Sequence, residues 1–137
     1  MVKMNSVVHF EMPAKDMNRM MEFYSKVFGW KTNMLGDEMG NYVLATTTEI
    51  DEETSFPKKP GAINGGFYKK TDDATSNYPS VVIGVDDYKE AIKNIRVAGG
   101  EISGEPMEIP GFGTYVSFFD TEGNRVGMMQ PNKNWKN

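Results

Sequence analysis

The feature that most constrains this chain is an internal repeat. Moving the sequence by 71 positions, the distance from Asp16 to Asp87, superimposes two segments that also align Gly29 with Gly100. In both segments apolar residues recur at i, i+3, i+4 and i+7, the spacing that turns one stripe of a helix toward a core. A repeat of this kind indicates two copies of one supersecondary unit.

Each of the two predicted helices has a recognisable start and end. Asp16 and Asp87 stand where an N-cap side chain accepts a hydrogen bond from an unpaired backbone N–H, and Glu90 would complete a capping box. Gly29 and Gly100 follow the last apolar position, where a helix commonly ends on a left-handed residue. The pattern therefore predicts helices that run between these residues.

Strand patterns surround each helix in the same order. One apolar strand precedes the helix, and three follow it; the predicted strands are 7–12, 30–35, 42–48 and 61–70 in the first copy, and 81–85, 101–103, 113–119 and 125–130 in the second. This order predicts an α+β domain of two tandem β-α-β-β-β modules. We expect a single domain over 1–137, with module one at 1–70, a linker at 71–78, module two at 79–131 and a short polar tail at 132–137.

The composition excludes several classes of function. A chain of 137 residues with 39% hydrophobic residues supports one core, and its net charge of -4, with no Lys/Arg run longer than two, argues against a nucleic-acid partner. Cysteine is absent, so there is neither a thiolate nucleophile nor a Cys-based metal site. No apolar run approaches the roughly 20 residues that span a bilayer, which predicts no membrane partner and a cytoplasmic location.

The two halves carry strings that resemble a known family. VVHFEMPAKDMNRMMEFYSKVFGW and IPGFGTYVSFFDTEGNRVGMMQP are similar to the opening and closing motifs of the vicinal oxygen chelate superfamily, which includes glyoxalase I, bleomycin-resistance proteins and extradiol dioxygenases. The resemblance implies that the modules form an open, U-shaped mixed sheet around a cavity for a small organic molecule. It also implies a possible homodimer. Members differ widely in their chemistry, so the fold does not specify the reaction.

The resemblance can be tested at the positions that hold a metal in the metal-dependent members, on the first, fourth, fifth and eighth strands. His9 occupies the first, but the repeat carries it to Ser80, the expected Glu of the last strand is Gly127, and 61–70 contains neither His nor carboxylate. A chelating site needs at least three converging protein ligands. The sequence thus predicts no metal cofactor; Zn, Ni, Mn or Fe held by His9, Glu11 and a third carboxylate is the less favoured alternative.

His9 is the only histidine, and strand alternation places it on the same face as Glu11. Three interpretations remain open. In the first, His9 lines the wall of the pocket and is hydrogen-bonded to a neighbour or to Glu11. In the second, His9 and Glu11 act as a catalytic acid/base pair, since an imidazole beside a carboxylate can move a proton near neutral pH. In the third, they hold a metal.

Further candidate ligand-binding residues come from the repeat and from the family's strand orientation. Tyr78, Ser80, Arg125 and Met129 are predicted to face the cavity, and Phe112 lies in a glycine-flanked loop at its edge. With His9 and Glu11, these residues form the predicted ligand site. Two functions follow as hypotheses: a binding module for a small organic ligand, or a glyoxalase-like lyase or isomerase that uses His9 and Glu11.

Overall fold

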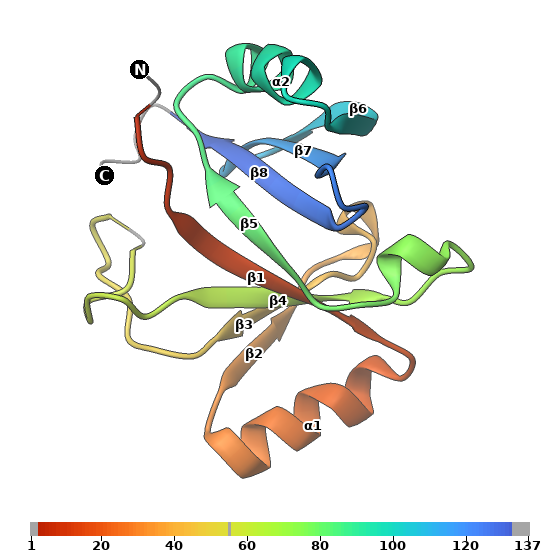
Figure 1. Ribbon diagram of the computed structural model, residues 1–137. Helices are drawn as coiled ribbons and strands as arrows, with labels where there is room; N and C mark the ends of the chain where they lie inside the picture. Colours follow the sequence, from red (N-terminus) through yellow and green to blue (C-terminus); the bar gives the residue numbers. More distant parts are fainter. Residues whose placement is uncertain (1–2, 55, 133–137) are drawn as a thin grey trace. The chain divides into compact units, whose positions relative to one another are not determined.

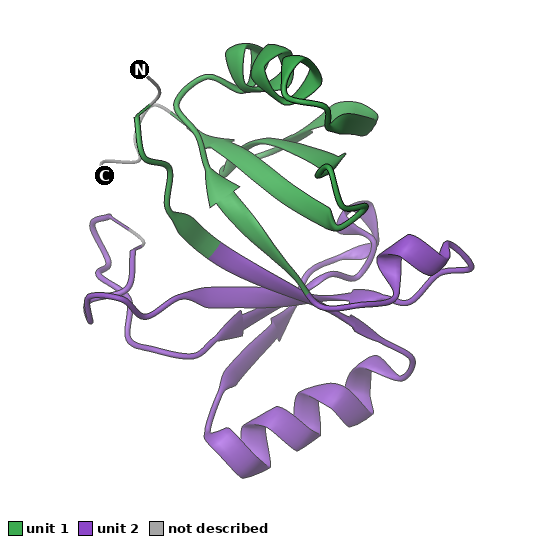
Figure 2. Cartoon of the chain, viewed as in Figure 1, with its two compact units in different colours: residues 1–8, 80–137 green, residues 9–79 purple. Residues whose placement is uncertain are grey.

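The computed structural model describes residues 3–54 and 56–132, and they divide into two compact units (Figures 1 and 2). The first, here called the β1–β4 unit, comprises residues 9–79. The second, the β5–β8 unit, comprises 3–8 together with 80–132 among the described residues. Each unit contains one α-helix and its own group of strands.

The β1–β4 unit begins within strand β1, whose first two residues belong to the other unit, and continues through a helix into three more strands. Its elements are β1 (Val7–Ala14), α1 (Met17–Phe28), β2 (Lys31–Met34), the 3₁₀ helix η1 (Asp37–Met39), β3 (Val43–Thr46), β4 (Asn64–Lys69) and the 3₁₀ helix η2 (Ala74–Ser76). The strand order is β2-β3-β4-β1. Strand β1 is parallel to β4, and the other two pairs are antiparallel.

The β5–β8 unit repeats this arrangement. Its elements are β5 (Ser80–Gly84), α2 (Tyr88–Val97), β6 (Glu101–Ile109), β7 (Gly113–Phe119) and β8 (Arg125–Pro131). The strand order is β5-β8-β7-β6, with β5 parallel to β8 and the other pairs antiparallel. The first strand of each unit therefore pairs in parallel with the last, which confirms the α+β class and the two tandem β-α-β-β-β modules.

The division of the chain is not the simple halving of the predicted modules. Residues 3–8 lie with the β5–β8 unit, where the Gly84 N–H donates to the Ser6 carbonyl at 2.9 Å. The predicted linker 71–78 contains η2, and most of the predicted tail, 133–137, lies outside the described residues. Ser6 and Gly84 are far apart in the sequence, and a contact between distant residues leaves no local signal that could have predicted it.

The helix starts agree with the predicted caps, and one predicted end does not. Asp16 accepts from the Arg19 N–H at 3.0 Å, and Gly29 ends α1 in the left-handed region with a φ of 72°. The left-handed residue after α2 is Gly99, with a φ of 99°, so the prediction at Gly100 is wrong by one position. A Cβ at Gly100 would lie 2.8 Å from the Phe119 carbonyl oxygen, which means that close packing requires this glycine.

Strand β6 also differs from the prediction, which ended it at Ser103. The strand continues to Ile109, but its register against β7 shifts between Ser103 and Met107. Gly104 has a φ of 74° at this irregularity, as a bulge favours. The glycine and the nearby proline broke the local pattern, whereas pairing with β7 carries the strand across them.

Each unit has its own core, on the sheet face that its helix covers. In the β1–β4 unit the side chains of Val43, Ala45 and Phe67 are fully buried beneath α1. Partly buried residues complete this cluster: Phe10, Met12, Met17, Met20, Met21, Tyr24 and Trp30. In the β5–β8 unit Val85, Val116 and Met128 are buried, and α2 contributes Tyr88, Ala91, Ile92 and Ile95. Polar residues of the strands are thereby left on the opposite face.

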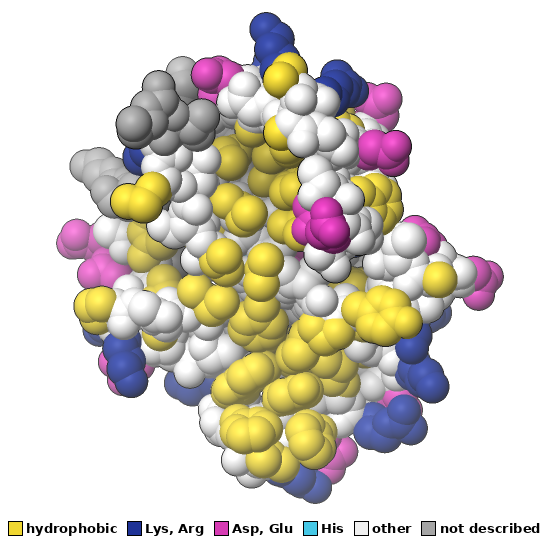
Figure 3. Space-filling view, viewed as in Figure 1, with side chains coloured by type: hydrophobic (Ala, Val, Ile, Leu, Met, Phe, Trp, Pro, Cys, Tyr) yellow, Lys and Arg dark blue, Asp and Glu magenta, His cyan; other side chains and the backbone are white. Residues whose placement is uncertain are grey.

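Helix α1 carries apolar side chains on its exposed side as well as on the side that faces the core. Phe23, Val27 and Phe28 are 52%, 55% and 60% exposed, and Figure 3 shows hydrophobic side chains gathered over this helix. The ring of Phe28 lies 6.0 Å from that of Tyr24, so the exposed rings continue the core aromatics outward. Neither helix in the described ranges is long and apolar enough to cross a membrane.

Candidate functional site

The polar residues of β1 lie on the face opposite α1. Phe10 and Met12 pack into the core of the β1–β4 unit, so alternation along the strand turns His9 and Glu11 the other way. Both residues are half-buried. The predicted sharing of one face by His9 and Glu11 is therefore confirmed.

Tyr42, just before β3, joins these two side chains. Its hydroxyl lies 2.9 Å from His9 Nε2 and donates to Glu11 Oε2 at 3.1 Å. The phenol comes from a residue more than 30 positions away along the chain, across strands β4 and β3. His9 and Glu11 are thus connected through a third residue rather than bonded directly to each other.

Two consecutive glycines of β4 make room for this arrangement. A Cβ at Gly66 would collide with the ring and hydroxyl of Tyr42, and a Cβ at Gly65 would meet the ring of Phe10. Adjacent strand residues face opposite sides of the sheet, so each glycine admits one aromatic ring on its own face. Glycine inside a strand often marks such a close approach, and it explains why the sequence Asn64-Gly-Gly-Phe67 can form the strand next to β1.

The environment of His9 keeps its ring uncharged. Burial lowers the pKa of His9 from 6.5 to about 4, because an imidazolium is poorly solvated there. The Tyr42 hydroxyl has one proton, and a carboxylate can only accept, so Tyr42 donates to Glu11 and must accept from His9. His9 therefore carries its proton on Nε2.

Asn64 lies beside His9 on β4, in register with it. Its Oδ1 accepts from the backbone N–H groups of Thr47 and Thr48 at 2.8 and 3.2 Å, and from Thr47 Oγ1 at 3.3 Å. These bonds fix the amide plane and direct its NH₂ group away from the loop. Neither Asn64 nor Tyr42 was among the predicted site residues; the signal that could have found them was the glycine pair next to Asn64.

Two further predicted site residues lie in segments between strands. Tyr78 precedes β5, its side chain is 71% exposed, and its carbonyl accepts from the Tyr68 hydroxyl at 3.3 Å. Phe112 is in the turn between β6 and β7, 36% exposed, and its N–H donates to the Ile109 carbonyl at 3.0 Å. Their role in binding a ligand stays a prediction.

The remaining predicted residues belong to the β5–β8 unit. Ser80 begins β5, and Arg125 begins β8, where its Nε donates to Ser117 Oγ at 2.9 Å. Met129 pairs with Tyr115 on β7, and since Met128 packs into the core, Met129 and Arg125 share the face away from α2. That this face lines a cavity, and that Arg125 and Met129 bind a ligand there, stay predictions.

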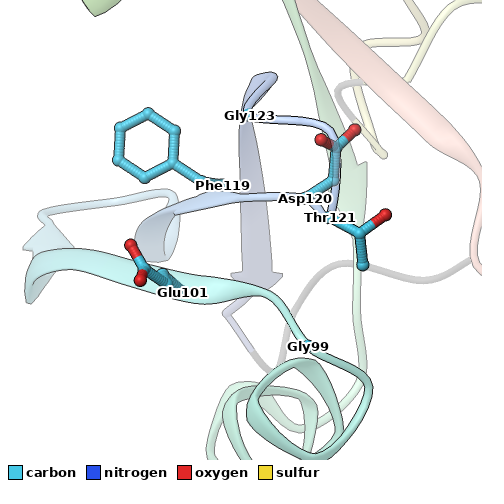
Figure 4. A pocket seen from close by; sticks show the side chains of 6 residues that line it. All are labelled: Gly99, Glu101, Phe119, Asp120, Thr121 and Gly123. Carbon is cyan, nitrogen blue, oxygen red and sulfur yellow. The ribbon is translucent and has the colours of Figure 1, made fainter.

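Two open depressions lie elsewhere on the units. One of about 430 Å³ surrounds the turn between β7 and β8 (Figure 4), lined by Gly99, Glu101, Phe119, Asp120, Thr121 and Gly123. Asp120 serves this turn, accepting from the N–H groups of Glu122 and Asn124 at 2.9 Å, and the hydrogen bonds from Asn124 lower the pKa of its carboxyl. The other, about 360 Å³, is lined by Ala14, Lys15, Met17, Met34, Gly40, Asn41 and Lys69. Neither includes His9 or Glu11.

Comparison with known proteins places this geometry in a family. A family model described as the Glyoxalase/Bleomycin resistance protein/Dioxygenase superfamily matches residues 6–128. The chain belongs to this superfamily. The match spans both modules and contains His9, Glu11 and Tyr42, so the site described above is part of the superfamily domain itself.

Relatives with similar sequences point to the same superfamily. The chain is 28% identical over 102 residues to a probable chloroplastic lactoylglutathione lyase of Arabidopsis thaliana, covering 74% of this chain but only 29% of that protein. It is 28% identical over 127 residues to a glyoxylase-like domain-containing protein of Didymella fabae, covering 90% of this chain and 92% of that one. The chain therefore spans less than a third of the lyase and nearly all of the second relative.

Solved structures of low sequence identity share the fold. A methylmalonyl-CoA epimerase in complex with methylmalonyl-CoA and NH4+ superimposes with a TM-score of 0.71 at 12% identity, over 98% of this chain and all of that one. The methylmalonyl-CoA epimerase from Mycobacterium tuberculosis gives a TM-score of 0.65 at 14% identity, over 96% and 93% of the two chains. At these identities the likeness shows the fold, which confirms the predicted glyoxalase-like class.

The superfamily's divalent metal does not fit the residues of this chain. Gly66 and Gly127 have no side chain, and a Cβ at Gly127 would lie 2.6 Å from the Tyr115 hydroxyl. In each unit a tyrosine thus covers a glycine on the face away from the helix. In residues 3–54 and 56–132 no group of three or more His, Asp or Glu side chains is placed to hold a metal ion.

Proposed function

We propose that this superfamily member binds a small organic ligand at the sheet face that carries His9, Glu11 and Tyr42, without a resident divalent metal. The observation that carries the proposal is the Tyr42 hydroxyl, which engages His9 Nε2 and Glu11 Oε2 together. A half-buried cluster of three polar side chains, held in fixed orientations by one another, is the usual polar part of a small-molecule site.

The hydrogen bonds also argue against a metal at His9 Nε2. Coordination through His9 Nε2 needs the lone pair of that atom, yet Nε2 bears the proton that it shares with Tyr42. A metal at Nε2 would have to displace the Tyr42 phenol, and Gly66 has no side chain that could serve as a second ligand. Ligand binding by hydrogen bonds leaves the whole arrangement intact.

A second candidate function is a glyoxalase-like lyase or isomerase in which His9 and Glu11 move protons. The continuous path from Glu11 through Tyr42 to His9 favours it, because hydrogen bonds between a carboxylate and an imidazole can relay a proton. The Arabidopsis relative is a probable lactoylglutathione lyase, which belongs to this reaction class. The two candidates share residues and differ in whether the bound molecule is converted.

Thermal shift with a library of small metabolites, aldehyde adducts and antibiotics tests the proposal, together with metal analysis of the purified chain. We expect hits that stabilise the protein equally with and without EDTA, and that are lost in His9→Ala. Tyr24→Phe is the matched control, since its hydroxyl only contacts Met12 Sδ on the helix side of the sheet. A stoichiometric metal in the purified protein, together with loss of the thermal-shift hits in EDTA, would contradict the proposal. Chemical conversion of a hit by the protein would favour the second candidate.

A cytoplasmic location and a homodimer in solution remain predictions from the sequence. Analytical ultracentrifugation of the purified chain measures the second directly, with a sedimentation coefficient for either 15.4 kDa or twice that mass.

A further inference from the structure

The depression of about 360 Å³ in the β1–β4 unit lies on the sheet face that α1 covers, where the chain turns from the end of β1 into the helix (Figure 1). On β1, its lining residue Ala14 comes two positions after the core residue Met12. On β4, its lining residue Lys69 comes two positions after the core residue Phe67. Because side chains alternate along a strand, the depression is on the face opposite to that of the candidate site.

The floor of this depression is apolar. Met17, the first residue of α1, packs against the core of the β1–β4 unit, and Ala14 is only 3% exposed. Met34, at the end of β2, is 41% exposed and lines the same space. Thioether side chains adapt their shape to what they contact. An apolar group placed here would therefore extend the hydrophobic core at the end where α1 begins.

The charged residues that line the depression are both cationic. They are Lys15 and Lys69, and both are exposed. Among residues 3–54 and 56–132, neither ammonium group has an ion-pair or hydrogen-bond partner. Asp16, the neighbour of Lys15, instead caps α1 by accepting from the Arg19 N–H at 3.0 Å. Two uncompensated positive charges at one depression favour an anion there, although the whole chain has a net charge of -4.

We infer that this depression binds a small organic anion. Its carboxylate or phosphate group pairs with Lys15 and Lys69, and its apolar part lies against Met17 and Met34. An inorganic ion would leave the apolar floor unused, and a neutral apolar molecule would leave the lysines unused, so the lining selects a molecule with both parts. The site goes beyond the proposed function, because it shares no residue with His9 and its neighbours.

Methionine methyl groups report on this site directly. In protein labelled with ¹³C at the methyl groups of its 11 methionines, the Met17 and Met34 resonances can be followed during titration. We expect hexanoate or phenyl phosphate to shift both resonances to saturation. Hexanamide, which matches hexanoate in length but is neutral, and acetate, which lacks the apolar chain, should each bind at least about fivefold more weakly than hexanoate.

Variants of the two lysines test the charge. Lys15→Gln combined with Lys69→Gln should weaken the binding of the anion about five- to tenfold, as expected for two exposed ion pairs. The matched control is Lys89→Gln combined with Lys93→Gln, which removes the same charge from exposed positions of α2 and should change the affinity less than twofold. His9→Ala should leave the titration unchanged, because His9 is on the other face.

The inference fails if neither hexanoate nor phenyl phosphate shifts the Met17 and Met34 resonances. Equal binding of hexanamide and hexanoate, or equal affinities of the two double variants, would also overturn it. Loss of the shifts in His9→Ala would place the anion at the other face and contradict the site. Failure of the proposed function is distinguishable from all of these, since it shows as the absence of library hits that depend on His9.

Discussion

At the scale of single residues, His9 determines what the site can do. It is half-buried, donates through Nε2 to Tyr42, and has a pKa lowered to about 4 by burial. An imidazole of this kind is neutral throughout the physiological range. Any proton transfer through His9 near pH 7 must therefore use the neutral ring as a base, not the imidazolium as an acid.

The lowered pKa predicts a specific dependence of stability on pH. Between about pH 4 and 6.5 the unfolded chain binds a proton at His9 that the folded chain does not, so the free energy of unfolding falls as the pH falls. The loss from this group approaches about 3 kcal/mol at pH 4 and is absent above pH 7. Urea denaturation of the wild type and of His9→Gln at several pH values measures it.

Comparing the wild type with His9→Gln isolates the contribution of the His9 imidazole. Carboxylates titrate in both, and the chain has no second histidine, so their difference reports on His9 alone. We expect the stability of His9→Gln relative to wild type to improve steadily from pH 7 to pH 4. Parallel curves for the two proteins would contradict the lowered pKa.

At the scale of elements, the site depends on the contact between β4 and the segment that leads into β3. Gly66 pairs with Leu44 on β3 and with Glu11 on β1, which places it beneath Tyr42 at the centre of three strands. A side chain at this position cannot share the space with the phenol. The glycine is thus as much a part of the site as the residues that carry polar groups.

We expect Gly66→Ala to destabilise the protein by about 1–3 kcal/mol, because its Cβ must displace Tyr42 in a well-packed sheet. Chemical denaturation gives this number. Gly36→Ala is the matched control: its Cβ would meet only Glu38 Oε1 at 3.4 Å, and we expect a change within about 0.5 kcal/mol.

A second variant identifies the cause of the loss. In a Tyr42→Ala background the obstruction is gone, so adding Gly66→Ala should cost far less than it does in the wild type. An equal cost in the two backgrounds would show that the glycine is needed for the backbone of β4 and not for the phenol.

At the scale of the whole molecule, two modules with the same strand order are each built around a separate core. Phe67 is fully buried at the centre of one core, and Met128 is 2% exposed in the other. The face away from each helix is left for polar and small residues, including a glycine under a tyrosine in both units. A glycine that admits a tyrosine ring thus recurs on the last strand of each module.

Truncation of either core should be costly. We expect Phe67→Ala to lower the free energy of unfolding by about 3–5 kcal/mol and Met128→Ala by about 2–5 kcal/mol. Val97→Ala, at a helix residue that is 89% exposed, should change it by less than about 0.5 kcal/mol. Urea denaturation followed by circular dichroism tests all three, and a negligible cost for either core variant would contradict the assignment of that core.

The sequence by itself determined the repeat, the two helices with their aspartate caps, the tandem modules and the common face of His9 and Glu11. These features depend on local periodicity, which is written along the chain. Only the tertiary structure placed Tyr42 between His9 and Glu11, moved the left-handed residue from Gly100 to Gly99, and joined residues 3–8 to β5. Each of these depends on strand register or on contact between residues far apart in sequence, and no local pattern encodes such a contact.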